Sequence, residues 1–178
     1  HFITNMKWEY KPTITISVSS STPNISQIKD FVSKNDFPIK LYEDDKNIAE
    51  RMLCADIAFG AGGTTSWERC CLGLPTLIFV LSQNQEYVSR ILDENNVIKV
   101  MSDVKYIIEK EIIEQLSYII DNAEVFNDMS MNSFRITDGL GTKRAVQIID
   151  PFQTNDGVSV SLRPMEHDDS EIIYEWQS

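Results

Sequence analysis

A glycine-rich stretch followed by hydroxyl residues is the part of the sequence best suited to chemistry. Residues 55–68 read ADIAFGAGGTTSWE, which predicts a short apolar strand, a glycine turn and the start of a helix. Glycines let a backbone come close to a bulky anion, and the first N–H groups of a helix attract negative charge. The pattern therefore favours a diphosphate site. Its expected ligand-facing residues are Gly60, Gly62, Gly63, Thr64, Thr65 and Ser66.

A carboxylate one helical turn later fits the same site. Glu68 could accept hydrogen bonds from two sugar hydroxyls at once, so the combination suits a nucleotide. The same residues also fit a capping box in which Thr65 is the N-cap and Glu68 reaches back to its N–H, and such a box needs no ligand. Spacing alone leaves both interpretations open. The glycines before the cap favour the ligand, because a helix needs none of them.

Two common phosphate signatures are excluded. The sequence lacks Gly-Lys-Ser/Thr, so it has no P-loop. The pattern Gly60-x-Gly62-x-x-Thr65 has threonine at the third glycine position of a dinucleotide fingerprint, and the following strand is not closed by an acidic residue. We therefore expect neither NAD nor FAD, and no cofactor is predicted.

Composition limits the partners. The chain has 178 residues, 42% of them hydrophobic, which is enough for one full domain with a core. Its formal net charge of −11 repels polyanions, so nucleic acid is not an expected partner. The longest apolar run, residues 74–81, is far shorter than the ~20 residues of a membrane span. A cytoplasmic protein without membrane contact is the default expectation.

Few residues could supply catalysis or bind a metal. The three cysteines lack Cys-x-x-Cys spacing, so neither a zinc site nor a disulfide framework is indicated. The only two histidines are His1 and His167, both far along the chain from the glycine turn. We therefore predict no catalytic residue in this chain, and the general base of any hydrolysis is expected to lie outside it.

Strands and helices alternate along residues 13–150. The strands are apolar rather than alternating, which predicts an α/β fold with a Rossmann-like parallel sheet and helices on both faces. Ligands of such sheets bind at the carboxyl ends of the strands. The strands are expected at residues 13–18, 37–42, 57–59, 76–81 and 97–100. The helices are expected at 25–34, 46–54, 67–72, 86–95, 106–121, 122–134 and 142–149, with residues 82–85 as a loop.

Two further loops are expected at the same edge of the sheet. Ser20 and Ser21 follow the first strand, and Pro23 at a helix N1 position could make a second anion-facing terminus. Asn84 and Gln85 follow the fourth strand and could bind hydroxyls or phosphate oxygens without adding charge. Considered alone, each loop is better interpreted as an ordinary polar cap or turn, and only the neighbouring glycine turn favours a ligand.

The chain ends differ in composition from this region. Residues 1–12 are interpreted as a lead-in segment that docks on something else, and 13–150 as the main domain. The Gly139–Gly141 stretch is expected to be a hinge, and residues 151–157 a linker. Residues 158–178 cannot form a core alone and are interpreted as the truncated start of another domain.

The segment from Ala55 to Pro75, with Asn84 and Gln85 after it, resembles the C-terminal domain of PseG-type UDP-sugar hydrolases. Residues 18–24 and 41–45 also fit, so the resemblance covers roughly residues 13–150. Those enzymes release UDP from a 2,4-diacetamido-trideoxy-hexose in the pseudaminic acid pathway, and relatives occur in spore-coat polysaccharide synthesis. More distantly the sequence is similar to the nucleotide-binding half of MurG-type glycosyltransferases, which implies the C-terminal half of a GT-B fold.

The resemblance implies a partner and a set of roles. The partner is UDP or a UDP-sugar, together with an N-terminal domain of the same polypeptide that carries the family's catalytic histidine. The fragment is therefore expected to bind UDP without turning it over. The resemblance implies that Gly62, Gly63, Thr64 and Thr65 hold the diphosphate, Glu68 the ribose and the backbone at Glu43 the uracil, with Asn84 and Gln85 facing the sugar and pyrophosphate and Ser20 and Ser21 near the phosphates.

Residues 161–176 resemble the first strand and helix of GNAT acetyltransferases, but the acetyl-CoA pyrophosphate loop of that fold is missing, so no acetyl transfer is expected. Three functions stay open on the sequence. The first is the UDP-binding half of a UDP-sugar hydrolase. The second is the corresponding half of a glycosyltransferase. The third is a non-catalytic regulatory module in which residues 65–68 only cap a helix.

Overall fold

The structure of the chain is a computed structural model that describes residues 2–9, 11–101, 109–149 and 152–160. Its backbone forms two compact units, residues 1–137 and 138–178. None of the described helices is both long enough and apolar enough to cross a membrane.

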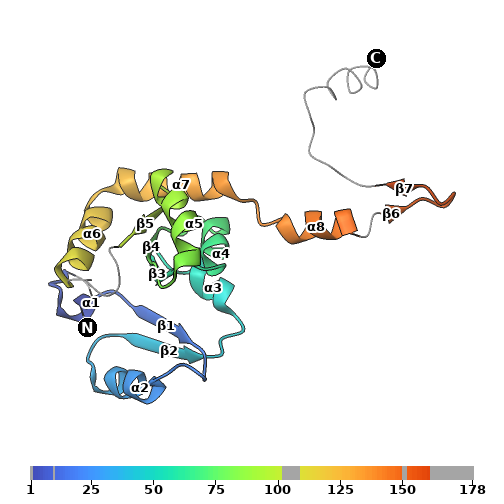
Figure 1. The fold of residues 1–178 in the computed structure, drawn as a ribbon. Coiled ribbons are helices and arrows are strands. Elements are labelled where there is room, and N and C mark those ends of the chain that lie inside the picture. The colour runs from blue at the N-terminus through green and yellow to red at the C-terminus, as the bar shows by residue number, and fades with distance from the viewer. Residues whose placement is uncertain (1, 10, 102–108, 150–151, 161–178) are drawn as a thin grey trace. The chain divides into compact units, whose positions relative to one another are not determined.

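All strands of the first unit that pair do so in parallel. Strand β1 (Ile14–Val18) pairs with β2 (Ile39–Glu43), and β4 (Thr76–Phe79) lies between β3 (Ala58–Ala61) and β5 (Ile98–Val100) (Figure 1). The hydrogen bonds thus divide the five strands into a pair and a triplet. The parallel α/β class predicted from the sequence is confirmed.

Helices follow the strands in the expected order, with boundaries that differ from the predictions by a few residues. The start of the helix predicted at 106–121 lies outside the described residues, and the short helix at Phe2–Asn5 was not predicted. The helices are α1 (Phe2–Asn5), α2 (Ile25–Lys34), α3 (Ile48–Leu53), α4 (Thr65–Cys71), α5 (Gln83–Glu94), α6 (Glu109–Asp121) and α7 (Ala123–Ile136).

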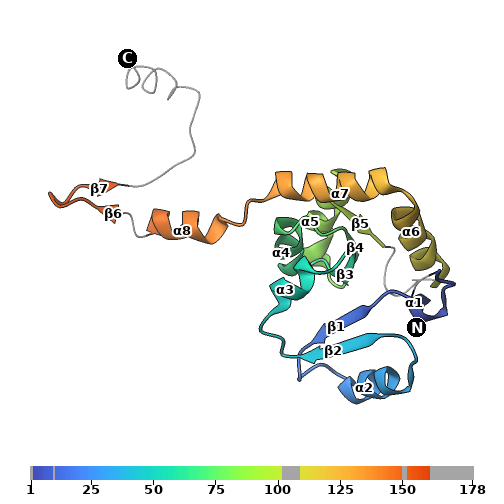
Figure 2. The same cartoon turned by 180° about the vertical axis from the view of Figure 1, so that it is seen from behind.

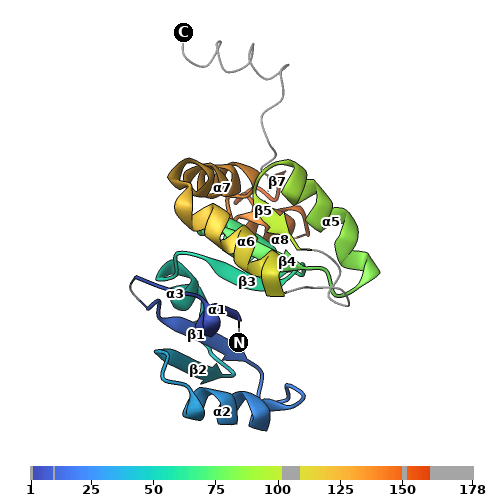
Figure 3. The same ribbon diagram turned by 90° about the vertical axis from the view of Figure 1, so that its left-hand side faces the viewer.

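The central strand β4 is buried on both faces because its side chains alternate between two apolar clusters. Ile78 packs with Cys70 of α4 and Leu92 of α5. Leu77 packs with Ile119 of α6 and Met129 of α7. Figure 3 shows the corresponding layers, with α5 on one side of β4 and β5 and with α6 on the other. This sandwich positions the end of β4, and with it the loops where a ligand is expected.

The β1–β2 pair is less buried. Its strands have alternating half-buried and exposed residues, and α2, which runs beside β2, has no fully buried side chain (Figure 2). The start of α2 also corrects a prediction: its N-cap is Asn24, in the left-handed conformation with φ of 62°, so Pro23 precedes the cap instead of occupying N1.

Gly73 marks the end of α4, the helix predicted at 67–72. It follows the C-cap with a φ of +61°, in the left-handed region that glycine adopts without strain. The chain then turns into β4 one residue after Pro75.

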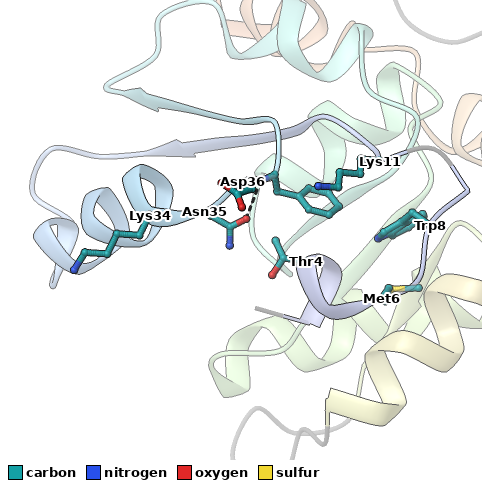
Figure 4. Close-up of a pocket in the computed structure, with 8 residues that line it drawn as sticks. Thr4, Met6, Trp8, Lys11, Lys34, Asn35 and Asp36 are labelled. Atoms are coloured by element: carbon teal, nitrogen blue, oxygen red, sulfur yellow. Dashed lines mark hydrogen bonds between the residues drawn. The ribbon is translucent and has the colours of Figure 1, made fainter.

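The N-terminal segment contacts its own unit. Helix α1 lies against α6, the indole N–H of Trp8 donates to the Ile3 carbonyl at 2.8 Å, and the Lys11 ammonium lies 5.5 Å from the centre of the Phe37 ring. Together with residues 34–36, this segment lines an open pocket of about 500 Å³ (Figure 4). These contacts lie within the first unit, and docking of the segment on something else stays a prediction.

The second unit contains α8 (Gly141–Ile149) and two short antiparallel strands, β6 (Phe152–Gln153) and β7 (Ser159–Val160). A tight turn joins the strands, with the Thr154 N–H donating to the Val158 carbonyl at 2.9 Å. The predicted linker is thus part of a hairpin. The segment interpreted as the start of a GNAT-like domain, residues 158–178, is described only as far as residue 160, and the proposed domain boundaries stay predictions.

Candidate functional site

The glycine turn lies at the carboxyl ends of β3 and β4, where parallel sheets bind ligands. The register pairs Ala61 with Phe79, so both strands end at the same level. The N–H of Gly62 donates to the Phe79 carbonyl at 3.2 Å and joins the two ends. We call this region, residues 60–68 and 80–85, the β3–β4 edge.

Three consecutive backbone N–H groups are open at this edge. Within the described part of the chain, the N–H groups of Gly63, Thr64 and Thr65 have no hydrogen-bond acceptor. The next two N–H groups are satisfied, since Ser66 donates to the Gly63 carbonyl and Trp67 to the Thr64 carbonyl, both at 3.0 Å. Unpaired N–H groups in succession are the usual backbone device for holding a phosphate. The structure therefore leaves donors free where the sequence predicts the diphosphate.

The capping box is not formed. Helix α4 begins at Thr65, the preceding Thr64 is already in the right-handed helical region, and no side-chain cap hydrogen bond is present there. The Glu68 carboxylate is exposed and makes no hydrogen bond or ion pair within the described residues. Of the two interpretations that the spacing left open, plain capping is wrong, and Glu68 is available to a ligand.

Two of the three glycines have a packing role that the sequence did not reveal. A Cβ on Gly60 would lie 2.0 Å from Nη1 of Arg69, and a Cβ on Gly62 would lie 2.3 Å from Oγ of Ser89. A Cβ on Gly63 would meet nothing within 4 Å. The glycines before the helix therefore do not by themselves indicate a ligand, because Gly60 and Gly62 are also required by packing. Only Gly63 is free of any packing requirement.

Arg69 is the functional candidate that sequence reasoning missed. Its side chain is 4% exposed, although it carries a charge. Nη2 donates to the Ala61 carbonyl at 2.9 Å and to Oγ of Ser66 at 3.3 Å, and Nε donates to the Thr65 carbonyl at 3.2 Å. Burial lowers the pKa of the guanidinium from its ordinary value. The available signal was an arginine four residues after Thr65, one turn along the helix that follows the glycines.

The hydroxyl of Ser66 does not face a ligand. Ser66 is 2% exposed, and its Oγ lies between the Ala61 carbonyl and the Arg69 guanidinium. The expectation that it offers a hydroxyl to an anion is wrong, because the first turn of α4 directs this side chain into the unit. Thr64 is exposed and Thr65 half-buried, so these two hydroxyls lie nearer the surface.

The two amides after β4 are engaged in local hydrogen bonds. Oε1 of Gln85 accepts from the Leu81 N–H at 3.0 Å, and Oδ1 of Asn84 accepts from the Ser82 hydroxyl. Gln85 also lies beside the turn, with its Cβ 3.5 Å from the position of a Cβ on Gly62. The structure thus brings Gln85 and the glycine turn together, while the amide oxygens of both residues hold their own loop.

The remaining predicted residues form a second group, at the carboxyl ends of β1 and β2. We call residues 17–21 and 43–45 the β1–β2 edge. The Ser20 N–H donates to Oδ1 of Asp44 at 2.9 Å, and the Ser21 N–H donates to Oγ of Ser19 at 3.2 Å. The hydrogen bonds from Ser20 hold the pKa of the Asp44 carboxyl below its ordinary value of 3.8. The side chain of Glu43 pairs with the Lys29 ammonium at 2.8 Å.

No hydrogen bond or ion pair in the described chain joins a predicted residue of one edge to a predicted residue of the other. The described pockets lie elsewhere: one is the N-terminal pocket of Figure 4, and another of about 350 Å³ lies between β5, α6 and α7. The described residues also contain no group of three or more His, Cys, Asp or Glu side chains that could hold a metal ion.

Comparisons with known proteins give a likeness of fold. No protein-family model matches the sequence, and no curated protein matches it. Among solved structures, the chain is similar to a glycotransferase of kitacinnamycin, with 12% identity, a TM-score of 0.56 and 82% of this chain covered. It is also similar to a Listeria monocytogenes protein assigned as a UDP-N-acetylglucosamine 2-epimerase, with 13% identity, a TM-score of 0.57 and 78% covered.

The chain spans 45% of the length of each of these two structures. At such low identity the likeness concerns the fold alone. It supports the distant GT-B relationship predicted from the sequence, and it defines the first unit as a Rossmann-like α/β domain of that architecture.

Proposed function

We propose that this chain is the nucleotide-binding half of an enzyme that acts on a UDP-sugar. The observation that carries the proposal is the run of three unpaired N–H groups at Gly63, Thr64 and Thr65, at the carboxyl end of a parallel sheet. A chain with a net charge of −11 has little general attraction for anions, so a local set of aligned donors is what a diphosphate would need. The likeness in fold to a protein named for UDP-N-acetylglucosamine supports the choice of nucleotide.

The proposed contacts divide between the two edges. At the β3–β4 edge the diphosphate accepts hydrogen bonds from the turn, and the exposed Glu68 carboxylate binds the ribose hydroxyls. At the β1–β2 edge the backbone at Glu43 binds uracil. The proposed UDP-sugar ligands are Gly62, Gly63, Thr64, Thr65, Glu68, Glu43, Ser20, Ser21, Asn84 and Gln85.

The proposed phosphate contacts differ in whether a ligand would have to replace existing hydrogen bonds. The N–H groups of Ser20 and Ser21 are already used by Asp44 and by Ser19, so a phosphate there would replace existing bonds and approach a carboxylate. The N–H groups of the glycine turn need no such exchange. The phosphates are therefore expected to be held mainly by the turn, with the serines in a secondary role.

The proposed reaction is hydrolysis of an activated acetamido-deoxy sugar with release of UDP, in surface polysaccharide synthesis of the pseudaminic acid or spore-coat kind. The general base and the sugar pocket are assigned to a separate N-terminal domain, because no histidine precedes or follows the turn within the main domain. A cytoplasmic location belongs to the same proposal, as does the GNAT-like identity of residues 161–178.

Calorimetric titration with UDP tests the nucleotide assignment. We expect measurable UDP binding and a weaker response to ADP, and Glu68→Gln is expected to lower UDP affinity by ~1–3 kcal/mol through lost ribose hydrogen bonds. Glu43→Gln is the matched control, since Glu43 is assigned through its backbone and its side chain forms only an exposed ion pair. No heat at millimolar UDP, or equal responses to UDP and ADP, would contradict the proposal.

Glycosyl transfer is the second candidate, since one of the similar structures is a glycotransferase. Both reactions need UDP at the same place, so the binding titration does not separate them. An assay of a longer chain that includes the proposed N-terminal domain does: free sugar as product supports hydrolysis, and acceptor-linked sugar supports transfer. A purely regulatory module would bind UDP with neither product.

A further inference from the structure

We propose that Arg69 is a positioning residue for the diphosphate at the glycine turn. Without touching the ligand, it holds the turn in shape from the inside and supplies a positive charge next to the unpaired N–H groups. This inference deepens the proposed function and rests on it.

The geometry of α4 directs this side chain toward the turn. A helical side chain leans toward the helix N-terminus, so an arginine at position 69 reaches back over residue 65. Its bonds end on the Ala61 carbonyl, the Thr65 carbonyl and the Ser66 hydroxyl. Those acceptors lie on either side of the open N–H groups in the sequence. One planar guanidinium therefore ties together the two ends of the turn.

The close fit requires Gly60. Nη1 of Arg69 lies 2.0 Å from where a Cβ on Gly60 would be, and Cζ lies 3.0 Å from it. The guanidinium thus packs against β3 at Gly60, with Nη1 as its nearest atom. Glycine at position 60 and arginine at position 69 act as a pair, which explains a glycine that has no positive φ and does not need to meet a ligand.

Within the described part of the chain the Arg69 guanidinium forms no ion pair, although the adjacent Glu68 carboxylate attracts its charge and, against the larger effect of burial, acts to raise its pKa. No carboxylate lies within 4.0 Å of it there, and its acceptors are two carbonyls and a hydroxyl. Arginine keeps its proton even when buried, so the positive charge persists in a site that excludes water. Coulomb interactions are stronger in such surroundings than in solvent. An anion bound at the turn would meet this charge in an otherwise strongly acidic chain.

A simpler view is that Arg69 only fills space and braces the turn. The two views differ in what they predict for ligands of different charge. Bracing alone would affect a neutral nucleoside and a charged nucleotide alike, since both need the same folded edge. If Arg69 instead contributes charge and aligns the donors, its loss should weaken binding more for ligands that carry more phosphates.

The test compares Arg69→Gln and Arg69→Lys with the wild-type chain. Calorimetry or competition is used to measure the affinities of UDP, UMP and uridine. We expect Arg69→Gln to lower the affinity for UDP at least about tenfold. The affinity for UMP should fall by a smaller factor, and that for uridine by less than about twofold. Arg69→Lys is expected to recover part of the UDP affinity, because it keeps the charge but loses the planar fork. Arg90→Gln is the matched control, an exposed arginine on α5 that pairs with Glu94, and it should leave all three affinities unchanged.

Each outcome decides the matter. A folded Arg69→Gln variant with wild-type UDP affinity, or with equal losses for UDP and uridine, overturns the role of Arg69 and leaves the proposed function standing. A wild-type chain that does not bind UDP overturns the proposed function and this role with it. If Arg69→Gln does not fold, as circular dichroism would reveal, Arg69→Lys replaces it: a greater loss for UDP than for uridine supports the inference, and equal losses overturn it.

Discussion

The two edges occupy equivalent places in the fold, but their backbone N–H groups differ in whether they are already hydrogen-bonded. At the β1–β2 edge, the loop N–H groups are consumed by the chain's own acceptors, the Asp44 carboxylate and the Ser19 hydroxyl. At the β3–β4 edge, three N–H groups are left open, and the nearest buried charge is the cation of Arg69. Both edges carry a carboxylate, Asp44 at the first and Glu68 at the second, but only the second offers an anion unpaired backbone donors.

The difference follows from burial. The β3–β4 edge stands on a strand that is packed on both faces, so its turn can be held by buried side chains while its donors stay open. The β1–β2 edge stands on strands with only half-buried residues, and its loops are held by their own exposed polar bonds. Sheet position alone does not make a phosphate site, because the loop must also be stabilised without using its N–H groups.

The largest expected contrast is in the reactivity of two cysteines, the buried Cys70 of α4 and the exposed Cys54. Cys70 lies in α4, is 1% exposed, and burial raises its pKa to about 11. Cys54, after α3, is exposed. At pH 8 iodoacetamide should modify Cys70 about 100-fold more slowly than the exposed Cys54, since raising a thiol pKa from 9.0 to about 11 leaves about a hundredth of its thiolate and burial also blocks the reagent. Mass spectrometry of timed samples measures both rates. In denaturant the rates should converge, and similar rates in the native chain would show that α4 is not firmly packed.

The glycines of the β3–β4 edge should differ sharply in their tolerance of a side chain. Gly60→Ala displaces the Arg69 guanidinium from its bonds, and Gly62→Ala meets Ser89, so each should lower the free energy of unfolding by about 2–3 kcal/mol. Gly63→Ala is the matched control and should change it by less than about 0.5 kcal/mol. Urea denaturation measures all three. Equal losses would mean that packing does not distinguish these glycines.

Removing one open N–H without removing a packed side chain tests the anion site directly. Thr64 has a φ of −56°, which proline adopts, and its N–H has no acceptor within the described residues. Thr64→Pro should therefore leave the melting temperature nearly unchanged and weaken UDP binding by about 1.5 kcal/mol, the loss of one hydrogen bond to a charged group. Thr64→Ala, which removes the hydroxyl and keeps the N–H, is the control. Wild-type UDP affinity in the proline variant would exclude this donor from the site.

The smallest expected effect is at the β1–β2 edge. Hydrogen bonds from Ser20 lower the pKa of Asp44 in the folded chain, so this carboxylate stabilises the fold at pH values above 3.8, and the contribution is lost as the pH falls through the lowered pKa. Asp44 is exposed, so the change should be slight. An NMR titration should place the Asp44 midpoint below 3.8 and show the Ser20 amide signal moving with it. In Asp44→Asn that movement should disappear, and a midpoint at or above 3.8 would contradict the hydrogen bonds.

Much of the first unit was predictable because its signals are local. The β-branched run before Val18 predicted β1, the segment 25–34 predicted α2 to the residue, and Gly73 marked the end of α4. Each of these features depends on neighbours within a few positions. The stretch at 55–68 likewise located the turn, which is where the open N–H groups lie.

The parts that were missed depend on contacts between distant residues. Gly62 faces Ser89, which belongs to a different helix, and no spacing rule connects them. Thr65 and Glu68 match a capping box in sequence, yet α4 begins without one because Arg69 and Ser66 hold the turn instead. A four-residue motif carries no information about which side chains from the rest of the fold contact it.

The sequence by itself determined the order of strands and helices, the parallel class and the place of the glycine turn, because periodicity and turn chemistry are short-range properties. Only the tertiary structure decided which residues of the turn are packed inside and which backbone donors stay open. It assigned Gly60 and Gly62 to packing, directed Ser66 inward, buried the charge of Arg69 and left the donors of residues 63–65 open. Those outcomes depend on which surfaces of α4 and α5 are pressed against the sheet, and burial is a property of the whole folded chain.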